Sequence, residues 1–206
     1  MLLAPDPVGT KYIVELLGWP EDRVVRATTL LQDDHLLTHE ARPTVTKNLF
    51  KALADVWCVD QPEAGLADEP MPGNSGLAEA LMLGLSDPEN EAGWALGGKL
   101  AAAAWGLPVG NTDGQLHFYV PSEPYLCRAE TDLGRATGAG VRAMARVSPM
   151  YWITRNRIDG ARRGLLNSHW PIVHPLVSAL EVGSVDPGLL SAWVAVPPEL
   201  AHRPWL

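Results

Sequence analysis

The stretch from residue 149 to residue 183 constrains the fold most, because it carries the longest helical periodicity in the chain and two prolines that interrupt it. Pro171 and Pro175 each lack an amide donor and crowd the preceding turn of a helix. We therefore expect two helices, or one kinked pair, that break near residues 167–171 and end at Gly183. The core-facing side of this helical hairpin is predicted from apolar residues three, four or seven apart: Ile158, Ala161, Leu165, Ile172, Leu176 and Leu180.

The length and the apolar content of the chain allow a real hydrophobic core. Its 206 residues, of which 47% are hydrophobic, fit one domain or two small ones, and we expect one domain overall. Residues 1–58 form a predicted N-terminal α/β portion, and residues 77–206 form a mainly helical portion. Residues 59–76 combine prolines, glycines and acids with few apolar side chains, which predicts a flexible loop or linker between them.

Helical patterns occupy most of the remaining sequence. A stripe of apolar residues predicts an amphipathic helix over residues 44–57. A short helix is expected over residues 77–85, and the string SDPE at 86–89 resembles a capping box that would start a long helix over residues 87–105. Another helix is expected over residues 131–146.

Strand patterns are few, so the predicted fold class is α+β: a compact, mainly helical domain with a minor β-sheet. Residues 115–120 alternate between apolar and polar side chains, which predicts a strand. One strand is not stable alone, so it needs a partner. Residues 23–31 suit a strand or a helix, and their β-branched residues favour the strand that would pair with it.

The charge balance narrows the class of partner. The net charge of −8 argues against a general nucleic-acid binder, although the arginines between residues 142 and 163 keep a local basic patch open. We therefore expect protein partners. No signal peptide and no run of about 18 apolar residues is present, so we expect a cytoplasmic protein without a membrane helix. Cys58 and Cys127 can pair with each other or stay reduced, the spacing does not decide between the two, and reduced thiols are the simpler expectation for a cytoplasmic protein.

The densest polar cluster runs from Asp33 to Glu40. His35 and His39 are four residues apart, so on a helix they lie on one face and can share a metal ion. Glu40 would serve as the base or as a third ligand, and zinc is the metal that such ligands favour. The alternative is a solvated acidic turn, in which the shared face is lost.

A second pair is Arg163 and His169. An arginine and a histidine at this spacing resemble the paired residues of helical ribonuclease domains of the HEPN type. The resemblance implies that His169 assists attack by a ribose hydroxyl while Arg163 steadies the phosphate, or that both residues contact a partner.

Three strings occur in the order in which similar strings occur in a peptidase family. They are LGGKLAA at 96–102, TDLGRAT at 131–137 with VRAM at 141–144, and ARRGLL at 161–166 followed by residues 176–181. With the string HEARP at 39–43, they resemble the peptidase domain of FtsH-type zinc metallopeptidases over residues 39–183, mainly over 95–183.

The resemblance implies a zinc site, with Asp132 as the aspartate ligand and His39 and Glu40 as the first half of an H-E-x-x-H motif. Pro43 stands where that motif has its second histidine, which leaves His35 as the replacement ligand. The implied function is that of a metallopeptidase-like domain with a degenerate zinc motif, acting as a binding or regulatory protein. The alternatives are a non-enzymatic subunit of a multiprotein assembly and a HEPN-like RNA-acting domain, so the sequence leaves open whether the chain is an enzyme.

Overall fold

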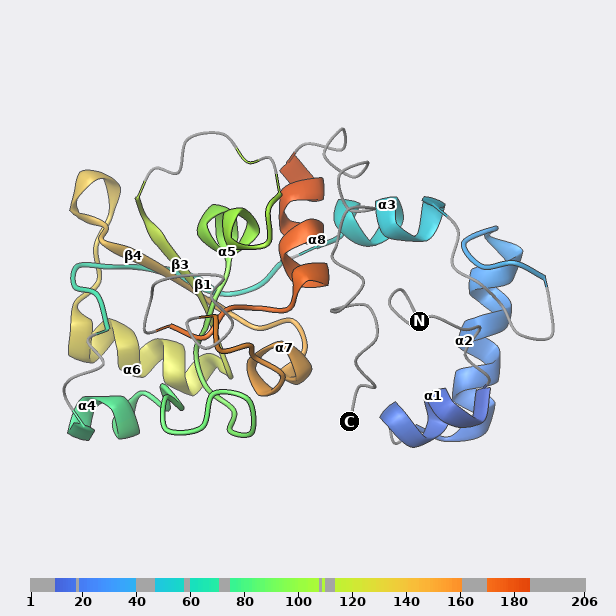
Figure 1. Cartoon of the computed structure of the whole chain (residues 1–206), viewed down its shortest axis with the longest axis horizontal. Helices are drawn as coiled ribbons and strands as arrows, with labels where there is room; N and C mark the ends of the chain where they lie inside the picture. Colours follow the sequence, from blue (N-terminus) through green and yellow to red (C-terminus); the bar gives the residue numbers. More distant parts are fainter. Residues whose placement is uncertain are drawn as a thin grey trace. The chain divides into compact units, whose positions relative to one another are not determined.

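The structure is a computed structural model that describes residues 10–17, 19–39, 47–57, 60–70, 75–107, 109, 114–160 and 170–185. The chain divides into two compact units, one formed by residues 1–57 with 194–206 and the other by residues 58–193 (Figure 1). The first unit contains helices α1 to α3. The second contains the described β-sheet and the other described helices.

In the first unit, α1 (Thr10–Leu17) packs against α2 (Glu21–Asp33). The carbonyl of Pro20 accepts the first amide hydrogen bonds of α2, and two acids in its first turn suit the positive end of the helix dipole. The strand favoured for residues 23–31 is therefore wrong. The β-branched residues there have only a modest intrinsic preference, and burial of Val24 on a helix outweighs it.

The next helix, α3 (Lys47–Asp55), confirms the amphipathic helix predicted over residues 44–57 for the part that the structure describes. Among the side chains of α3 that the structure describes, those of Leu49 and Ala54 are buried. The residues just before Lys47 lie outside the described part of the chain.

The second unit is built on a four-stranded mixed sheet with the strand order β1-β4-β3-β2. The central strands β3 (Leu116–Val120) and β4 (Ala143–Val147) run parallel, with Phe118 opposite Ala145. The edge strands β1 (Glu63–Leu66) and β2 (Ala95–Leu96) pair antiparallel with β4 and β3. The strand predicted over residues 115–120 is thus confirmed, and its main partner is β4.

Helices cover both sides of this sheet. Figure 1 shows α6 (Glu123–Leu133) on one side, and α5 (Gly98–Ala104) with α8 (Pro175–Val185) on the other. The helix α6 also connects β3 to β4, because a parallel pair needs a crossover. The described residues of the unit form three more short helices, namely α4 (Ser75–Ala80), the 3-10 helix η1 (Gly138–Gly140) and α7 (Tyr151–Arg155). A mainly helical α+β fold with a minor sheet is therefore confirmed.

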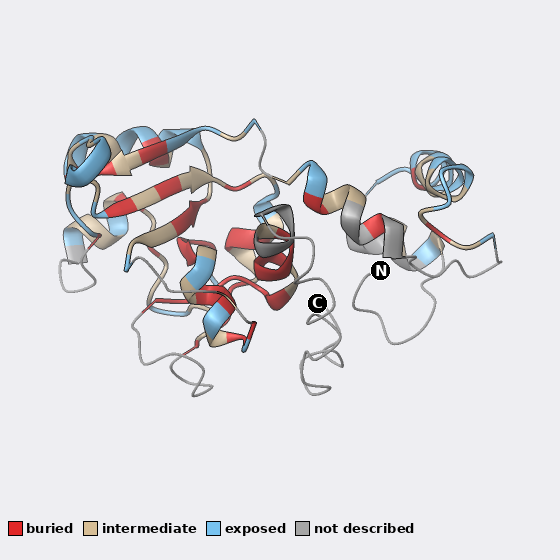
Figure 2. Cartoon of the chain, turned by 90° about the horizontal axis from the view of Figure 1, so that it is seen from above, coloured by how far each residue is buried: buried red, intermediate tan, exposed pale blue. Residues whose placement is uncertain are grey.

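Aromatic side chains fill one part of the core. The ring of Phe118 packs against those of Trp94 and Trp170, at centroid distances of 5.5 and 4.8 Å. The indole N–H of Trp94 donates to the carbonyl of Leu81 at 2.8 Å, so its one polar group is satisfied inside the protein. Figure 2 shows the buried residues gathered on the strands and on the elements packed against them.

The helical hairpin predicted over residues 149–183 is wrong in its first half. In the part of that half that the structure describes, residues 149–160, only α7 is helical, and Ile158 forms an antiparallel bridge with Ile172 through two hydrogen bonds of 2.8 and 2.9 Å. The backbone N–H and C=O groups of Ile158 are thus satisfied by pairing with an extended segment and not by a helix. Residues 161–169 lie outside the described residues. The second half is a helix, α8, which begins at Pro175 because proline suits a first turn, and it passes through Gly183 to Val185.

The long helix predicted over residues 87–105 is also wrong. Residues 87–90 form a turn, β2 follows, and only α5 is helical. The Ser86 hydroxyl donates to the carboxylate of Glu91 at 2.7 Å, so it does not cap a helix. The short helix predicted over residues 77–85 holds only as far as Ala80, because Met82 has a φ of 55° and cannot continue it.

Two further predictions fail where a chain segment joins the sheet. Residues 131–146 were expected to be one helix, but α6 ends before Gly134, whose φ is 74°, and the segment ends as β4. Residues 59–76 were expected to be a flexible loop or linker, but Glu63–Leu66 pair with β4 over their whole length. In both cases the strand is stabilised by hydrogen bonds to strands that are distant in sequence. The local pattern of apolar and polar residues does not predict such pairing.

The aromatic core gives a first prediction. Phe118→Ala should lower the free energy of unfolding by about 3 kcal/mol or more, because it leaves a cavity beside two tryptophan rings. Urea unfolding followed by tryptophan fluorescence measures this change. Met150→Ala is the control, because that side chain is 48% exposed, and it should change stability by less than about 0.5 kcal/mol. Equal effects of the two substitutions would contradict the placement of this core.

Candidate functional site

The structure places the predicted histidine pair in a turn rather than on a helix face. The amide of Leu36 donates to the carbonyl of Leu31, and that of His35 donates to Gln32, which is the Schellman pattern of a helix end. His35 itself has a φ of 56°, the left-handed conformation that glycine usually supplies there. The prediction that His35 and His39 share one face of a helix is therefore wrong. The two exposed imidazole rings nevertheless lie edge to face, with centroids 6.1 Å apart.

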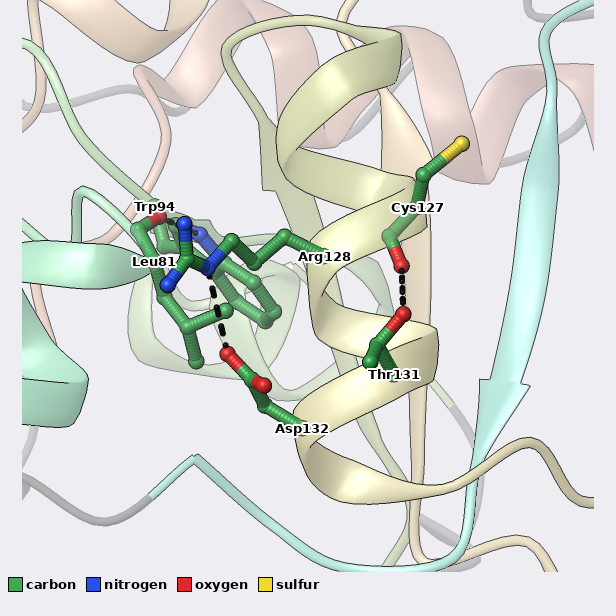
Figure 3. Close-up of polar contacts among 6 residues, drawn as sticks. All are labelled: Leu81, Trp94, Cys127, Arg128, Thr131 and Asp132. Carbon is green, nitrogen blue, oxygen red and sulfur yellow. Dashed lines mark hydrogen bonds and ion pairs between the residues drawn. The ribbon is translucent and has the colours of Figure 1, made fainter.

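The other proposed ligand, Asp132, lies in the last turn of α6 in the second unit. Its carboxylate accepts a hydrogen bond from Arg128 Nε at 3.3 Å, an exposed pair one helical turn apart (Figure 3). Such surface pairs contribute little to stability. Glu40, Arg163 and His169 lie outside the described residues. Within the described part of the chain, no group of three or more His, Cys, Asp or Glu side chains is placed to hold a metal ion. The zinc site stays a prediction.

A half-buried carboxyl group forms the first candidate site that the structure adds. Glu181, on α8, accepts a hydrogen bond from the amide of Gly98 at 2.9 Å and another from the hydroxyl of Tyr119 at 3.0 Å. A Cβ atom at Gly97 would lie 3.2 Å from both carboxylate oxygens, so glycine allows this close approach. Gly98 has a φ of 64°, which also favours glycine. The glycine pair thus creates the space that Glu181 occupies.

Burial raises the pKa of Glu181 from its usual 4.5 to about 7, while the two hydrogen bonds and the charge of Arg146 act in the opposite direction. Arg146 is paired with Glu63 across β4 and β1, with Nε and Oε2 3.0 Å apart. The carboxyl group can therefore exchange a proton near neutral pH, which is one property of an acid–base site.

The space beside Glu181 limits what this site can do. A cavity of about 20 Å³ lies there, which is enough for one water molecule but not for a substrate. It is lined by Glu63, His117, Phe118, Tyr119, Met144, Arg146 and Glu181. We therefore interpret the cluster as a proton-binding site within the fold. The sequence analysis did not predict this site. Its signal in the sequence is that Glu181 is the one charged residue of the apolar helix α8.

The second candidate site rests on a buried arginine. Arg157 is 2% exposed, and its two terminal nitrogens donate hydrogen bonds of 2.6 to 3.0 Å to four backbone carbonyls. The acceptors are the carbonyls of Leu83, Gly84, Glu91 and Trp94. Desolvation lowers the pKa of Arg157 to about 10, so the side chain stays charged at neutral pH. One guanidinium thus holds two irregular segments side by side.

An open groove lies over these two segments. It has a volume of about 640 Å³, and its lining residues come from α4, from the segment 82–92 and from α7. They are Ala78, Glu79, Met82, Gly84, Leu85, Ser86, Glu91, Ala92 and Tyr151. Most of these are apolar, the two charged ones are acids, and Tyr151 is 59% exposed. The carbonyls of Gly84 and Glu91 accept hydrogen bonds from Arg157, so one buried side chain holds two of the residues that line this groove. A preformed, mainly apolar groove can bind a ligand.

A third buried polar residue has a structural role. His174 lies just before α8, and its Nδ1 accepts the amide hydrogen of Leu176 at 3.1 Å. Its ring meets Trp152 edge to face at 5.5 Å. Burial lowers the pKa of His174 to about 3, so the imidazole is neutral at physiological pH and stabilises the start of the helix.

Comparisons with known proteins give no family for the chain. No protein-family model matches it, and no curated protein or solved structure matches it either. Among the described helices, none is long and apolar enough to cross a membrane.

Glu181 makes stability depend on pH. Because its folded-state pKa is raised, its contribution is fully present below about pH 4.5 and is lost as the pH rises through about 7. We expect the free energy of unfolding to fall by about 2 kcal/mol between about pH 5 and pH 8 from this group, allowing for its partial exposure. Glu181→Gln keeps the shape of the side chain and removes the charge, so urea unfolding of this variant should lack that component. An unchanged pH profile would contradict the assignment.

Arg157 gives a prediction about local order. Arg157→Met leaves four carbonyls without their donors, so the free energy of unfolding should fall by about 3 kcal/mol or more. Amide hydrogen exchange should also become faster over residues 83–94. Arg157→Lys is the matched control, because it restores the charge but not the planar set of donors, and it should recover only part of the loss. If Arg157→Lys instead kept the full stability of the wild type, the positive charge alone, and not the four hydrogen bonds, would stabilise these segments.

Proposed function

We propose that this chain is a non-enzymatic binding protein, and that the groove beside Tyr151 receives a segment of a partner protein. The observation that carries this proposal is the groove of about 640 Å³, in which Arg157 holds two of the lining residues, Gly84 and Glu91. Rigid sites bind with a smaller entropic cost, because fewer groups must be ordered on association. The proposal agrees with the binding or assembly role expected from the incomplete zinc motif.

The composition of the groove supports a protein partner. Tyrosine and methionine are enriched where proteins meet, and Tyr151, Met82 and Leu85 supply such contacts here. The neighbouring Met150 is also 48% exposed. The peptidase and RNA alternatives depend on Glu40, Arg163 and His169, which lie outside the described residues, so no described contact favours either of them.

Removal of Tyr151 tests the proposal. Short random peptides displayed on phage are selected against the full chain, and the dissociation constants of the selected peptides are measured by fluorescence anisotropy. Tyr151→Ala should weaken their binding by about tenfold or more, because truncation of an aromatic ring that contacts the peptide costs about 1–2 kcal/mol.

Tyr125→Ala is the matched control, because it removes a tyrosine from α6 that does not line the groove. Its effect on affinity should stay within about twofold. Peptides that bind the Tyr151→Ala variant as tightly as the wild type, or a selection that yields no binder, would refute the proposed function.

A further inference from the structure

The charges around the groove indicate which partner it suits. Its two charged lining residues, Glu79 and Glu91, come from α4 and from the turn that precedes β2. The same turn carries two more acids, Asp87 and Glu89. Glu79 and Glu91 are both exposed and lie on two different elements, so two segments of the chain contribute negative charge to the groove.

The nearby cations offset only part of this charge. Arg157 lies beneath the segments that form the groove, where Glu91 and Asp87 favour its charged form and Arg155 opposes it. The two charged residues that line the groove are thus both acids, and the guanidinium of Arg157 is itself buried under backbone carbonyls. The groove that an incoming ligand meets is acidic.

The remaining lining residues specify the rest of the ligand. Met82, Leu85 and Ala92 offer an apolar surface, and the exposed ring of Tyr151 offers a face to a cation. Lysine and arginine bind well where an aromatic face and a carboxylate lie close together. An acidic ligand would instead place like charges together and would be rejected.

On the basis of the proposed function, we infer that the occupant of the groove is a short segment of another protein in which an apolar side chain adjoins lysine or arginine. The apolar side chain fills the space over Met82 and Leu85, and the cation lies between Tyr151 and the acids Glu79 and Glu91. Binding of such a segment depends on salt, because Glu79 and Glu91 are exposed and their fields are screened within about 8–10 Å.

The test uses the peptides selected from the random library, each paired with a synthetic copy in which glutamine replaces every lysine and arginine. We expect the selected set to be enriched in lysine and arginine, and the glutamine copies to bind at least about tenfold more weakly. Glu79→Lys, which reverses one charge of the groove, should weaken the original peptides by about tenfold. Glu123→Lys makes the same change on α6, away from the groove, and should leave their affinity within about twofold.

The outcomes separate the two proposals. Peptides that lose affinity with Tyr151→Ala but are not enriched in lysine or arginine, and that bind the Glu79→Lys variant normally, would overturn this inference and leave the proposed function standing. Peptides that are insensitive to Tyr151→Ala would overturn both. Equal losses with Glu79→Lys and Glu123→Lys would assign the effect to net charge and would also overturn the inference.

Discussion

The second unit depends on the hydrogen bonds between Arg157 and four backbone carbonyls. A buried cation is costly unless its donors are paired, and a buried carbonyl without a donor is costly as well. The guanidinium therefore needs the carbonyls as acceptors, and the carbonyls need the guanidinium as their donor. The segment between α4 and β2 follows a defined path although it has almost no regular secondary structure, because its carbonyls converge on one side chain. Gly84 and Gly93 allow the convergence, since a Cβ atom at either position would lie 2.7 Å from a guanidinium nitrogen.

A single extended segment connects this contact to the other polar cluster. Leu96 donates to the carbonyl of Pro171 and accepts from the amide of Val173, and Ile158 pairs with Ile172 between them. Residues 171–173 therefore hold β2 and the chain after Arg157 together. The helix α8 starts directly afterwards, which brings Glu181 over the glycine pair that follows β2. The groove and the proton-binding carboxyl group thus share one backbone frame, although their side chains come from different elements.

The sequence predicts those parts of the fold that depend on local periodicity. The helix around Leu49 and the strand around Phe118 have patterns that suit both their local conformation and their packing. Prediction fails where distant partners decide the structure. The small residues from 95 to 104 favour one helix, but carbonyls bound by Arg157 and pairing with β3 replace its first half. The same holds for the sites. Arg157 is one of the arginines between residues 142 and 163, and no spacing along the chain shows that four carbonyls surround it. Glu181 alone had a local signal, a lone acid in an apolar helix.

The pairing of β1 with β4 imposes an order on the assembly of the sheet. Glu63 and Arg146 are 83 positions apart along the chain, whereas β3 and β4 are joined by one crossover through α6. Closing the shorter loop loses less chain entropy, and parallel pairing already requires α6 to be in place. On this argument β3 and β4 pair before β1 joins them as an edge strand. During synthesis β1 leaves the ribosome long before its partner exists. The strand β1, Glu-Ala-Gly-Leu, is short and begins with an exposed acid. Both features disfavour pairing with a wrong strand before β4 is synthesised.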